Sequence, residues 1–184
     1  MKKNNNHDSK LTDALNSILV NNAKKYAIKC HRETNHKYDG KPYEIHLQMV
    51  VEYACKYSYL IDENFLEEII ASAWTHDTIE DCRQTYNDVK KKLGFEVAEI
   101  TYALTNEKGK NRNERANSSY YRGIRNTYLA TYVKICDRLA NVKYSKLKNS
   151  KMIEAYKKEN KKFMQELYTI ELNPMWLELS ALLN

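Results

Sequence analysis

The chain has 184 residues, with 30 Lys and Arg against 24 Asp and Glu and a net charge of +6 at pH 7. Four glycines and two prolines are too few for the many turns of a β sandwich or barrel. No apolar run approaches the ~18 residues that a membrane span needs, and the charge excess alone does not predict nucleic-acid binding. Four cysteines without a Cys-x-x-Cys pair predict free thiols in a reducing cytoplasm. The polar start of the chain lacks the apolar core of a signal peptide.

Apolar residues at helical spacing predict helices through the first half of the chain. Asp8 or Ser9 is expected to cap the first of them, and Pro42 suits the first turn of the second. Asp62 is expected to cap the third, which runs into a polar segment. The expected helices cover residues 9–32, 42–59 and 62–81, with a loop over residues 33–41 that turns at Asp39-Gly40.

Helical patterns continue through the second half, on both sides of one long polar loop. Thr85 is expected to cap a short helix that Gly94 ends, and Thr127 a long one. Asn173-Pro174 is typical of a helix start. The polar, basic stretch 105–118 is expected to be a loop, and a loop of this length in a compact domain is often functional. The expected helices cover residues 86–93, 95–104, 128–146 and 151–170 and a last short segment.

Together these patterns predict an all-α fold, a compact helical bundle of about six to eight helices. We expect residues 9–184 to form a single domain and residues 1–8 to be a disordered N-terminal lead.

The segment His76-Asp77-Thr78-Ile79-Glu80-Asp81 gathers an imidazole and three carboxylates within six residues. On a continuous helix, residues four apart share a face, so His76 would lie over Glu80 and Asp77 over Asp81. Carboxylates held this close repel one another unless a cation lies between them. A divalent metal ion is therefore expected at this segment.

Two further residues on other helices are candidates for the same site. His46 lies on the preceding helix; taken alone, it would more often be a structural histidine than a ligand. Asp137 lies in an apolar helix, where a buried carboxylate is costly unless it is paired. A set of two histidines and two aspartates suits Mn²⁺, Fe²⁺ or Zn²⁺ better than Ca²⁺ or a thiolate zinc site.

Three motifs follow one another in a fixed order between residues 31 and 142. They are Gly40-Lys41-Pro42-Tyr43-Glu44-Ile45-His46, His76-Asp77-Thr78-Ile79-Glu80-Asp81 and Asp137-Arg138-Leu139-Ala140-Asn141. With these motifs the chain resembles the HD superfamily of metal-dependent phosphohydrolases. Within it, the chain is most similar to the branch that hydrolyses the alarmone (p)ppGpp.

The resemblance implies one divalent metal ion, for which Mn²⁺ is the first choice and Fe²⁺ or Zn²⁺ are alternatives. It implies that Glu80 and Asp81 are catalytic and that they position and deprotonate the attacking water. The reaction implied is removal of the 3′-diphosphate of a phosphorylated nucleotide, guanosine-3′,5′-bis(diphosphate), as pyrophosphate. The metal ligands implied are His46, His76, Asp77 and Asp137.

Substrate-binding candidates lie around these motifs. Alarmone hydrolases usually carry a basic pair before the first motif, and the aligned positions here are Asn35 and His36. Nearby cations could compensate for the missing pair, and arginines of the long polar loop could bind phosphate through bidentate geometry. Lys134 is expected to hold either Asp137 or a phosphate. The substrate-binding candidates are Arg32, Lys37, Lys41, Tyr43, Arg112, Arg115, Lys134 and Asn141.

Other functions stay open on the sequence alone. The runner-up is an HD-type phosphohydrolase that acts on other nucleotides or phosphoesters, and a second alternative is a non-catalytic module that senses a nucleotide. A nucleic-acid-binding role is disfavoured because no recognition motif is visible. We expect a cytoplasmic protein without a membrane partner.

Overall fold

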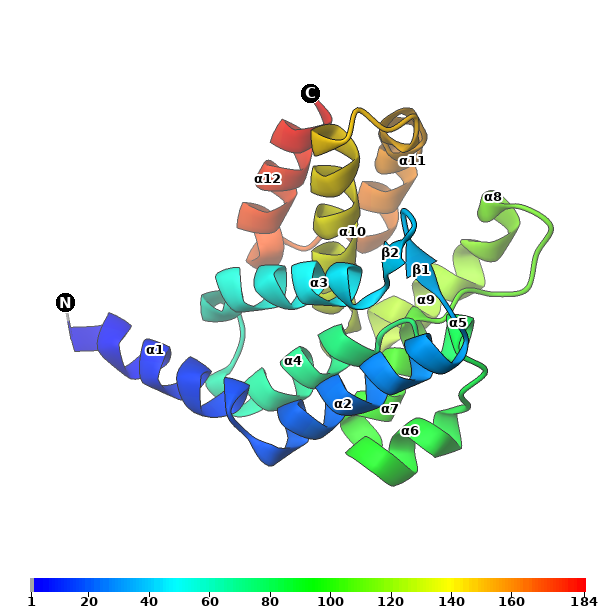
Figure 1. Ribbon diagram of the computed structural model, residues 1–184. Coiled ribbons are helices and arrows are strands. Elements are labelled where there is room, and N and C mark those ends of the chain that lie inside the picture. The colour runs from blue at the N-terminus through cyan, green and yellow to red at the C-terminus, as the bar shows by residue number, and fades with distance from the viewer. Residues whose placement is uncertain (1) are drawn as a thin grey trace.

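The computed structural model describes residues 2–184 and is built almost entirely from helices (Figure 1). The two strands of a short hairpin are β1 (Lys37–Tyr38) and β2 (Lys41–Pro42). The α-helices of the first half are α1 (Lys2–Leu15), α2 (Ile18–Glu33), α3 (Glu44–Lys56), α4 (Leu66–Thr75) and α5 (Thr78–Asp81). Those of the second half are α6 (Tyr86–Leu93), α7 (Phe95–Leu104), α8 (Arg112–Arg115), α9 (Ser118–Asn126), α10 (Ala130–Leu147), α11 (Met152–Leu167) and α12 (Asn173–Leu183). Three short 3₁₀ segments cover Ser58–Leu60, Glu63–Phe65 and Ile170–Leu172.

The predicted all-α class is confirmed, but the described residues form twelve α-helices, more than the six to eight predicted. The excess arises because helices expected to be continuous are split. The helix predicted over residues 9–32 is broken at residues 16–17, where the Ser17 hydroxyl accepts a hydrogen bond from Val20 N at 3.2 Å and caps α2. Asp62 caps a 3₁₀ turn rather than α4 itself.

The N-terminal segment differs from the disordered lead predicted over residues 1–8. Helix α1 begins at Lys2, and Met1 lies outside the described residues. His7 Nε2 lies 2.8 Å from the Ser58 hydroxyl, and Lys10 pairs with Glu63. These partners lie about fifty residues away in the chain, so a local pattern could not reveal them.

The segment predicted as a loop over residues 33–41 forms the β1–β2 hairpin, in which Lys37 pairs with Pro42 and Tyr38 with Lys41. Its turn lies at Asp39-Gly40, as predicted. Both turn residues adopt positive φ, 52° and 74°, as is required in the two-residue hairpin turns that match the right-handed twist of the strands. Pro42 belongs to the second strand, so α3 begins at Glu44 and not at the proline.

The second half follows the predicted boundaries with three exceptions, the first of which is the short helix α8 inside the stretch 105–118 that was predicted to be a loop. Thr85 and Asp88 form a reciprocal capping box at the start of α6, and Gly94, at φ 94°, ends that helix. Helix α9 lies where no helix was predicted. Helix α10 begins at Ala130 rather than after Thr127, because Leu129 adopts a left-handed conformation at φ 65°.

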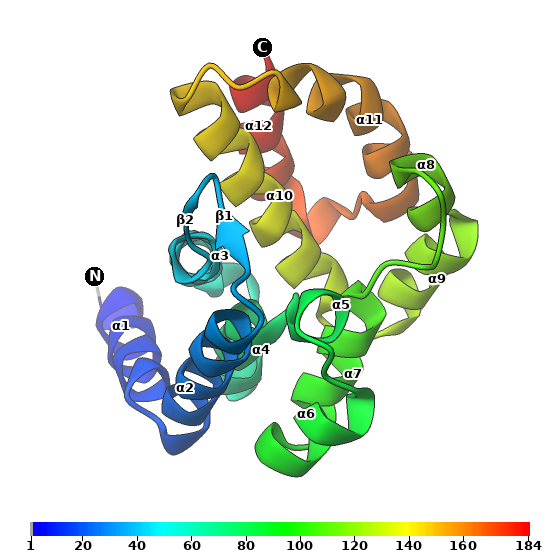
Figure 2. The same cartoon turned by 45° about the vertical axis from the view of Figure 1, so that its right-hand side comes forward.

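Helices α3, α4 and α10 meet at the centre of the fold, and α2, α7 and α12 pack around them (Figures 1 and 2). The hairpin lies against the start of α3 and beside α10, while α8 and α11 lie on the other side of α10 (Figure 2). The core between these helices is apolar, so the polar side chains that project into it stand out. The largest fully buried core side chains include Leu47, Ile70, Leu139 and Trp176.

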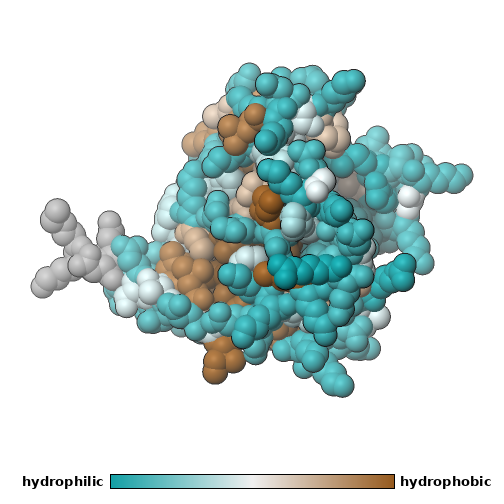
Figure 3. Space-filling model, viewed as in Figure 1, coloured by the Kyte–Doolittle hydropathy of each residue, from teal (hydrophilic) through white to brown (hydrophobic). Residues whose placement is uncertain are grey.

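The face shown in Figure 3 is mainly hydrophilic, and its hydrophobic residues lie in separate patches. Exposed apolar side chains of this kind are ordinary for a folded domain. Across residues 2–184, none of the helices has both the length and the apolar character needed to cross a membrane.

Candidate functional site

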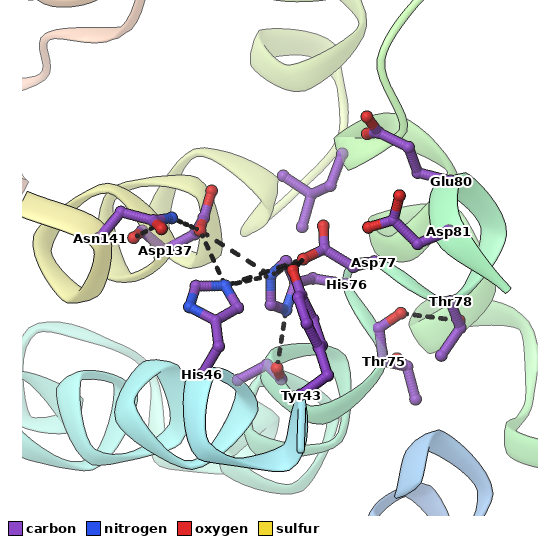
Figure 4. Close-up of polar contacts among 12 residues, drawn as sticks. Tyr43, His46, Thr75, His76, Asp77, Thr78, Glu80, Asp81, Asp137 and Asn141 are labelled. Carbon is purple, nitrogen blue, oxygen red and sulfur yellow. Dashed lines mark hydrogen bonds and ion pairs between the residues drawn. The ribbon is translucent and has the colours of Figure 1, made fainter. Parts of the chain in front are cut away.

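Three separate parts of the fold bring the four predicted metal ligands together (Figure 4). His46 lies on α3, Asp137 on α10, and His76 and Asp77 at the junction of α4 and α5. The sequence predicted a continuous helix through this junction, which is wrong. Helix α4 ends at Thr75, Asp77 leaves helical geometry at φ −102° and ψ 1°, and the Thr78 hydroxyl donates to Thr75 O at 2.7 Å.

The break in the helix turns the side chains of His76 and Asp77 toward His46. His46 Nε2 lies 3.3 Å from His76 Nε2 and 3.7 Å from Asp77 Oδ2, while His76 Nε2 lies 2.8 Å from Asp77 Oδ2. These three residues form a group that could hold a metal ion. Asp137 Oδ1 approaches the two histidines from α10, at 3.3 Å from His46 Nε2 and 3.8 Å from His76 Nε2.

The donor atoms fit a divalent transition-metal ion. Ligands with bonds of about 2.1 Å lie roughly 3.0–3.4 Å from one another around such an ion, and the contacts observed here span 2.8–3.8 Å. His76 Nδ1 faces Ala73 O at 3.0 Å, so an N–H on that nitrogen leaves the Nε2 lone pair directed into the site. Two nitrogens and carboxylate oxygens form a mixed donor set that suits Mn²⁺, Fe²⁺ or Zn²⁺.

The electrostatics of the group also favour a cation. Burial alone would lower the pKa of His76, but Asp77 and Asp137 raise it to about 9. Burial alone would raise the pKa of Asp77 and of Asp137, but His76 holds the first, and Lys134 together with His46 the second, below their usual range. Both carboxylates are therefore ionised, and their negative charge is concentrated around two histidines that are each 1% exposed.

Three of the residues predicted to bind substrate line the cavity described below and also contact the ligand candidates. The Tyr43 hydroxyl donates to Asp77 Oδ2, and its ring stacks against His31 and His36 with centroids 4.3 and 4.0 Å apart. Lys134 Nζ donates to Asp137 Oδ2 at 2.9 Å, the first of the two roles predicted for this lysine, and it also lines the cavity.

Asn141 is the third residue of this kind. Its amide nitrogen donates to Asp137 O at 3.1 Å and also to the Asp137 carboxylate. The Asn141 amide thus orients a ligand candidate, and Asn141 also lines the cavity, so its contact with the nucleotide stays a prediction.

Glu80 and Asp81 lie on α5, on the other side of Asp77 from His46 (Figure 4). Glu80 is held by Asn106, whose backbone N–H donates to Oε2 at 3.2 Å and whose side chain donates to both carboxylate oxygens at 2.9 and 3.0 Å. The sequence did not single out Asn106; its position at the start of the polar loop 105–118 was the only signal.

The Asp81 carboxyl has an unusual environment. Burial, assisted by the charges of Asp77 and Glu80, raises its pKa to about 7. His36 Nδ1 lies 3.7 Å from Asp81 Oδ2. A carboxyl group that titrates near neutral pH is suited to accept a proton during catalysis.

Replacing Asp81 with asparagine is expected to stabilise the metal-free protein at pH 8 much more than at pH 5. The folded pKa of about 7 lies above the ordinary value of ~3.9, so ionisation of Asp81 costs folding stability as the pH rises between these values. Asparagine does not ionise and avoids this cost. Thermal unfolding in the presence of a chelator checks the result, with the exposed Asp13→Asn as the matched control. An equal gain at both pH values would contradict the prediction.

Three of the four ligand candidates, His46, Asp77 and Asp137, line a cavity of about 440 Å³, a size typical of small-molecule sites. Arg112 and Arg115, which were both predicted to bind substrate, line this cavity. Arg112 is held by Glu159 at 2.7 and 3.1 Å. Arg138 also pairs with Glu159, at 2.9 Å, and its guanidinium lies 4.9 Å from the Tyr156 ring centroid. Further lining residues are Asn106, Tyr120, Tyr121, Lys158 and Lys162.

Three predicted substrate residues do not reach this cavity. Arg32 is exposed and makes a bidentate ion pair with Glu44, at 2.8 and 3.2 Å. Lys37 precedes Tyr38 on β1, and because neighbouring strand residues point to opposite sides, Tyr38 faces the site and Lys37 faces solvent. Lys41 is exposed on β2. Among the described residues, the cations of loop 31–41 therefore lie outside the cavity lining.

Comparisons with known proteins agree with this geometry. The family model described as HD domain matches residues 23–168. A guanosine-3′,5′-bis(diphosphate) 3′-pyrophosphohydrolase MESH1 from Danio rerio is 29% identical over 119 residues, 64% of either chain. A guanosine-3′,5′-bis(diphosphate) 3′-pyrophosphohydrolase from Aquifex aeolicus is 33% identical over 131 residues, which are 67% of this chain and 17% of that protein. The match thus spans less than two thirds of the length of either relative.

A solved structure also shares the fold. It is that of a metazoan ortholog of SpoT that hydrolyses ppGpp, and it superposes with a TM-score of 0.72 at 21% sequence identity. The superposition covers 90% of this chain and 94% of the other. The helical arrangement described above is therefore a known one.

Proposed function

This chain belongs to the HD domain family, and from that premise we propose that it is a metal-dependent hydrolase that removes the 3′-diphosphate of guanosine-3′,5′-bis(diphosphate) as pyrophosphate. One observation carries the proposal: His46, His76 and Asp77 converge, and His46 and Asp77 line a cavity that is also lined by further carboxylates and cations. The two curated relatives described above, both named as 3′-pyrophosphohydrolases of this nucleotide, support the choice of substrate.

His46, His76, Asp77 and Asp137 would hold one divalent ion, for which we propose Mn²⁺. Two imidazoles and two carboxylates form a set of intermediate hardness that this ion accepts. When bound, such an ion polarises a phosphoryl oxygen and lowers the pKa of a water molecule. The role of the protein is then to position substrate and water and to move protons.

Glu80 and Asp81 are the proposed catalytic residues. Glu80, fixed by Asn106, is placed to hold the attacking water by a hydrogen bond. Asp81, with a pKa of about 7, can accept the proton of that water at neutral pH. The water attacks the phosphorus that is bonded to the ribose 3′-oxygen, this P–O bond breaks, and the 3′-oxygen takes up a proton. The products are GDP and pyrophosphate.

The rest of the cavity would bind the nucleotide. Arg112 and Arg115 lie on the segment that follows Asn106, and guanidinium groups bind phosphate through paired hydrogen bonds. Lys162 Nζ donates to Ala116 O at 2.8 Å and so ties this segment to α11. The Tyr156 ring, which lies between Arg112 and Arg138, offers the nucleotide an aromatic surface beside these cations.

The proposal is tested by incubating the protein with Mn²⁺ and a panel of nucleotides and separating the products by anion-exchange chromatography. We expect guanosine-3′,5′-bis(diphosphate) to yield GDP and pyrophosphate in equal amounts. We also expect a chelator to stop the reaction and added Mn²⁺ to restore it. Orthophosphate released from nucleoside monophosphates would favour a broader phosphohydrolase. Nucleotide binding without turnover would favour a sensing module.

A further inference from the structure

Tyr38 is a side chain outside the three motifs that contacts the metal-ligand candidates from two directions. It lies on β1, and its ring is nearly parallel to that of His46, with centroids 4.8 Å apart and an interplanar angle of 18°. Its hydroxyl donates to Asn141 Oδ1 at 2.9 Å. One tyrosine thus connects to His46 directly and to Asp137 through Asn141.

His46 needs this kind of support because its outer nitrogen, Nδ1, has no hydrogen-bond partner among residues 2–184. A ligating histidine almost always donates its second N–H to a carbonyl or carboxylate, which fixes the ring. His76 has such a partner in Ala73 O. His46 Nδ1 is buried, and the described residues offer it no hydrogen bond. Away from the ligand cluster, the His46 ring is therefore positioned by packing, with the ring of Tyr38 on one side and that of Tyr43 at 5.2 Å.

The hydroxyl of Tyr38 acts along a chain of hydrogen bonds. Because Asn141 Oδ1 accepts from Tyr38, the amide nitrogen of Asn141 faces Asp137 and donates to it. Linked hydrogen bonds of this kind strengthen one another. Loss of the Tyr38 hydroxyl removes one hydrogen bond from the Asn141 amide, so the Asp137 carboxylate is held less firmly.

The hairpin that carries Tyr38 is itself fixed on α10. The Tyr144 hydroxyl donates to Asp39 Oδ2 at 2.8 Å, and the rings of Tyr38 and Tyr144 meet edge to face at 4.9 Å. Asp137, Asn141 and Tyr144 are spaced by four and three residues, so they share one face of the helix. The hairpin therefore lies along the face of α10 that supplies a ligand candidate.

We propose that Tyr38 is a positioning residue that sets the geometry of the metal centre, through ring packing on His46 and through Asn141 on Asp137. This inference rests on the proposed metal site but not on the identity of the substrate. It assigns a function to the β1–β2 hairpin. The motif residues alone do not explain what this hairpin does.

The test measures Mn²⁺ affinity without substrate, from the electron paramagnetic resonance signal of the free ion. Tyr38→Leu removes both contacts and is expected to weaken binding about 10–100-fold, the usual cost of losing an outer partner of a ligand. Tyr38→Phe keeps the ring and is expected to fall between Tyr38→Leu and the unaltered protein. Tyr86→Phe is the matched control: it loses a hydroxyl that donates to Glu99 at 2.6 Å, outside the cavity lining and the hairpin, and it should bind Mn²⁺ as the unaltered protein does.

A double-mutant comparison separates the two routes. If the hydroxyl acts through Asn141, Tyr38→Phe with Asn141→Ala should bind Mn²⁺ no more weakly than Asn141→Ala alone. In kinetics, Tyr38→Phe should raise the Mn²⁺ concentration for half-maximal rate while leaving kcat at saturating Mn²⁺ within about twofold of the unaltered protein, since only the metal site is loosened.

Three results would overturn the inference: unchanged affinity in Tyr38→Leu, an equal loss in Tyr86→Phe, or no binding of Mn²⁺ by the unaltered protein. An unaltered protein that binds Mn²⁺ but cleaves no guanosine-3′,5′-bis(diphosphate) would contradict the proposed function alone.

Discussion

Replacement of Asp77 by asparagine is expected to abolish nucleotide hydrolysis while the protein remains folded. Asp77 Oδ2 lies 2.8 Å from His76 Nε2 and 3.7 Å from His46 Nε2, and it also accepts the Tyr43 hydroxyl. The amide of asparagine is neutral and binds a divalent ion poorly. Losing an outer partner of a ligand costs about 10–100-fold in activity, so losing a direct ligand is expected to lower kcat by more than that. Steady-state kinetics with Mn²⁺ check the result.

Asp62→Asn is the matched control for Asp77→Asn. It makes the same chemical change at a position away from the site, and asparagine can replace aspartate as the cap of the 3₁₀ turn there. We expect near-normal activity in this variant and similar circular dichroism spectra for both. If Asp77→Asn retained a tenth or more of the activity, Asp77 would not be a metal ligand.

Replacement of Lys134 by methionine is expected to destabilise the metal-free protein by about 3 kcal/mol or more, the usual cost of breaking a buried ion pair. Burial alone would lower the pKa of Lys134, but Asp137 and Tyr120 hold it well above its usual range, so the ammonium is charged. Its loss leaves the Asp137 carboxylate in a buried site without its cation at 2.9 Å. Urea unfolding in the presence of a chelator measures the change.

Mn²⁺ provides a second test of Lys134→Met. An ion that binds only the folded state stabilises it, and at this site it also neutralises Asp137, so saturating Mn²⁺ should recover part of the lost stability. Lys143→Met, an exposed change on the same helix, should alter stability by no more than about 0.5 kcal/mol. A loss below 1 kcal/mol in Lys134→Met, or no recovery with Mn²⁺, would contradict the account of this pair.

The helical class and most element positions followed from local patterns. Apolar spacing predicted the α-helices, and Thr85, Gly94 and Asn173-Pro174 marked boundaries that the structure has. The break at residues 16–17 has a local signal, the Ser17 cap, that the prediction did not use, whereas the break before α5 depends partly on a tertiary contact. At the break before α5, the Tyr43 hydroxyl and the turn at Thr75-Thr78 compensate for the interrupted helix.

The chemistry of the site was predictable where residue type and spacing carry it. Four side chains of types that commonly bind metal ions lie on three predicted segments. Because a buried polar group is costly without a partner, these side chains were expected to contact one another in the core. Tyr38, which contacts His46, and Asn106, which holds Glu80, lie in a hairpin and a loop. In such segments local patterns do not indicate which side chain points inward. The same reason explains why the sequence did not show that Arg32, Lys37 and Lys41 lie outside the cavity lining.

The most direct test of the proposed function is hydrolysis of guanosine-3′,5′-bis(diphosphate) by the Mn²⁺-loaded protein in ¹⁸O-water, with the products analysed by mass spectrometry. Water that attacks the phosphorus next to the ribose 3′-oxygen must leave its oxygen on the departing diphosphate. The account predicts pyrophosphate that carries one ¹⁸O, unlabelled GDP, and no reaction after chelation. Label in GDP, release of orthophosphate, or turnover that survives removal of the metal would contradict it.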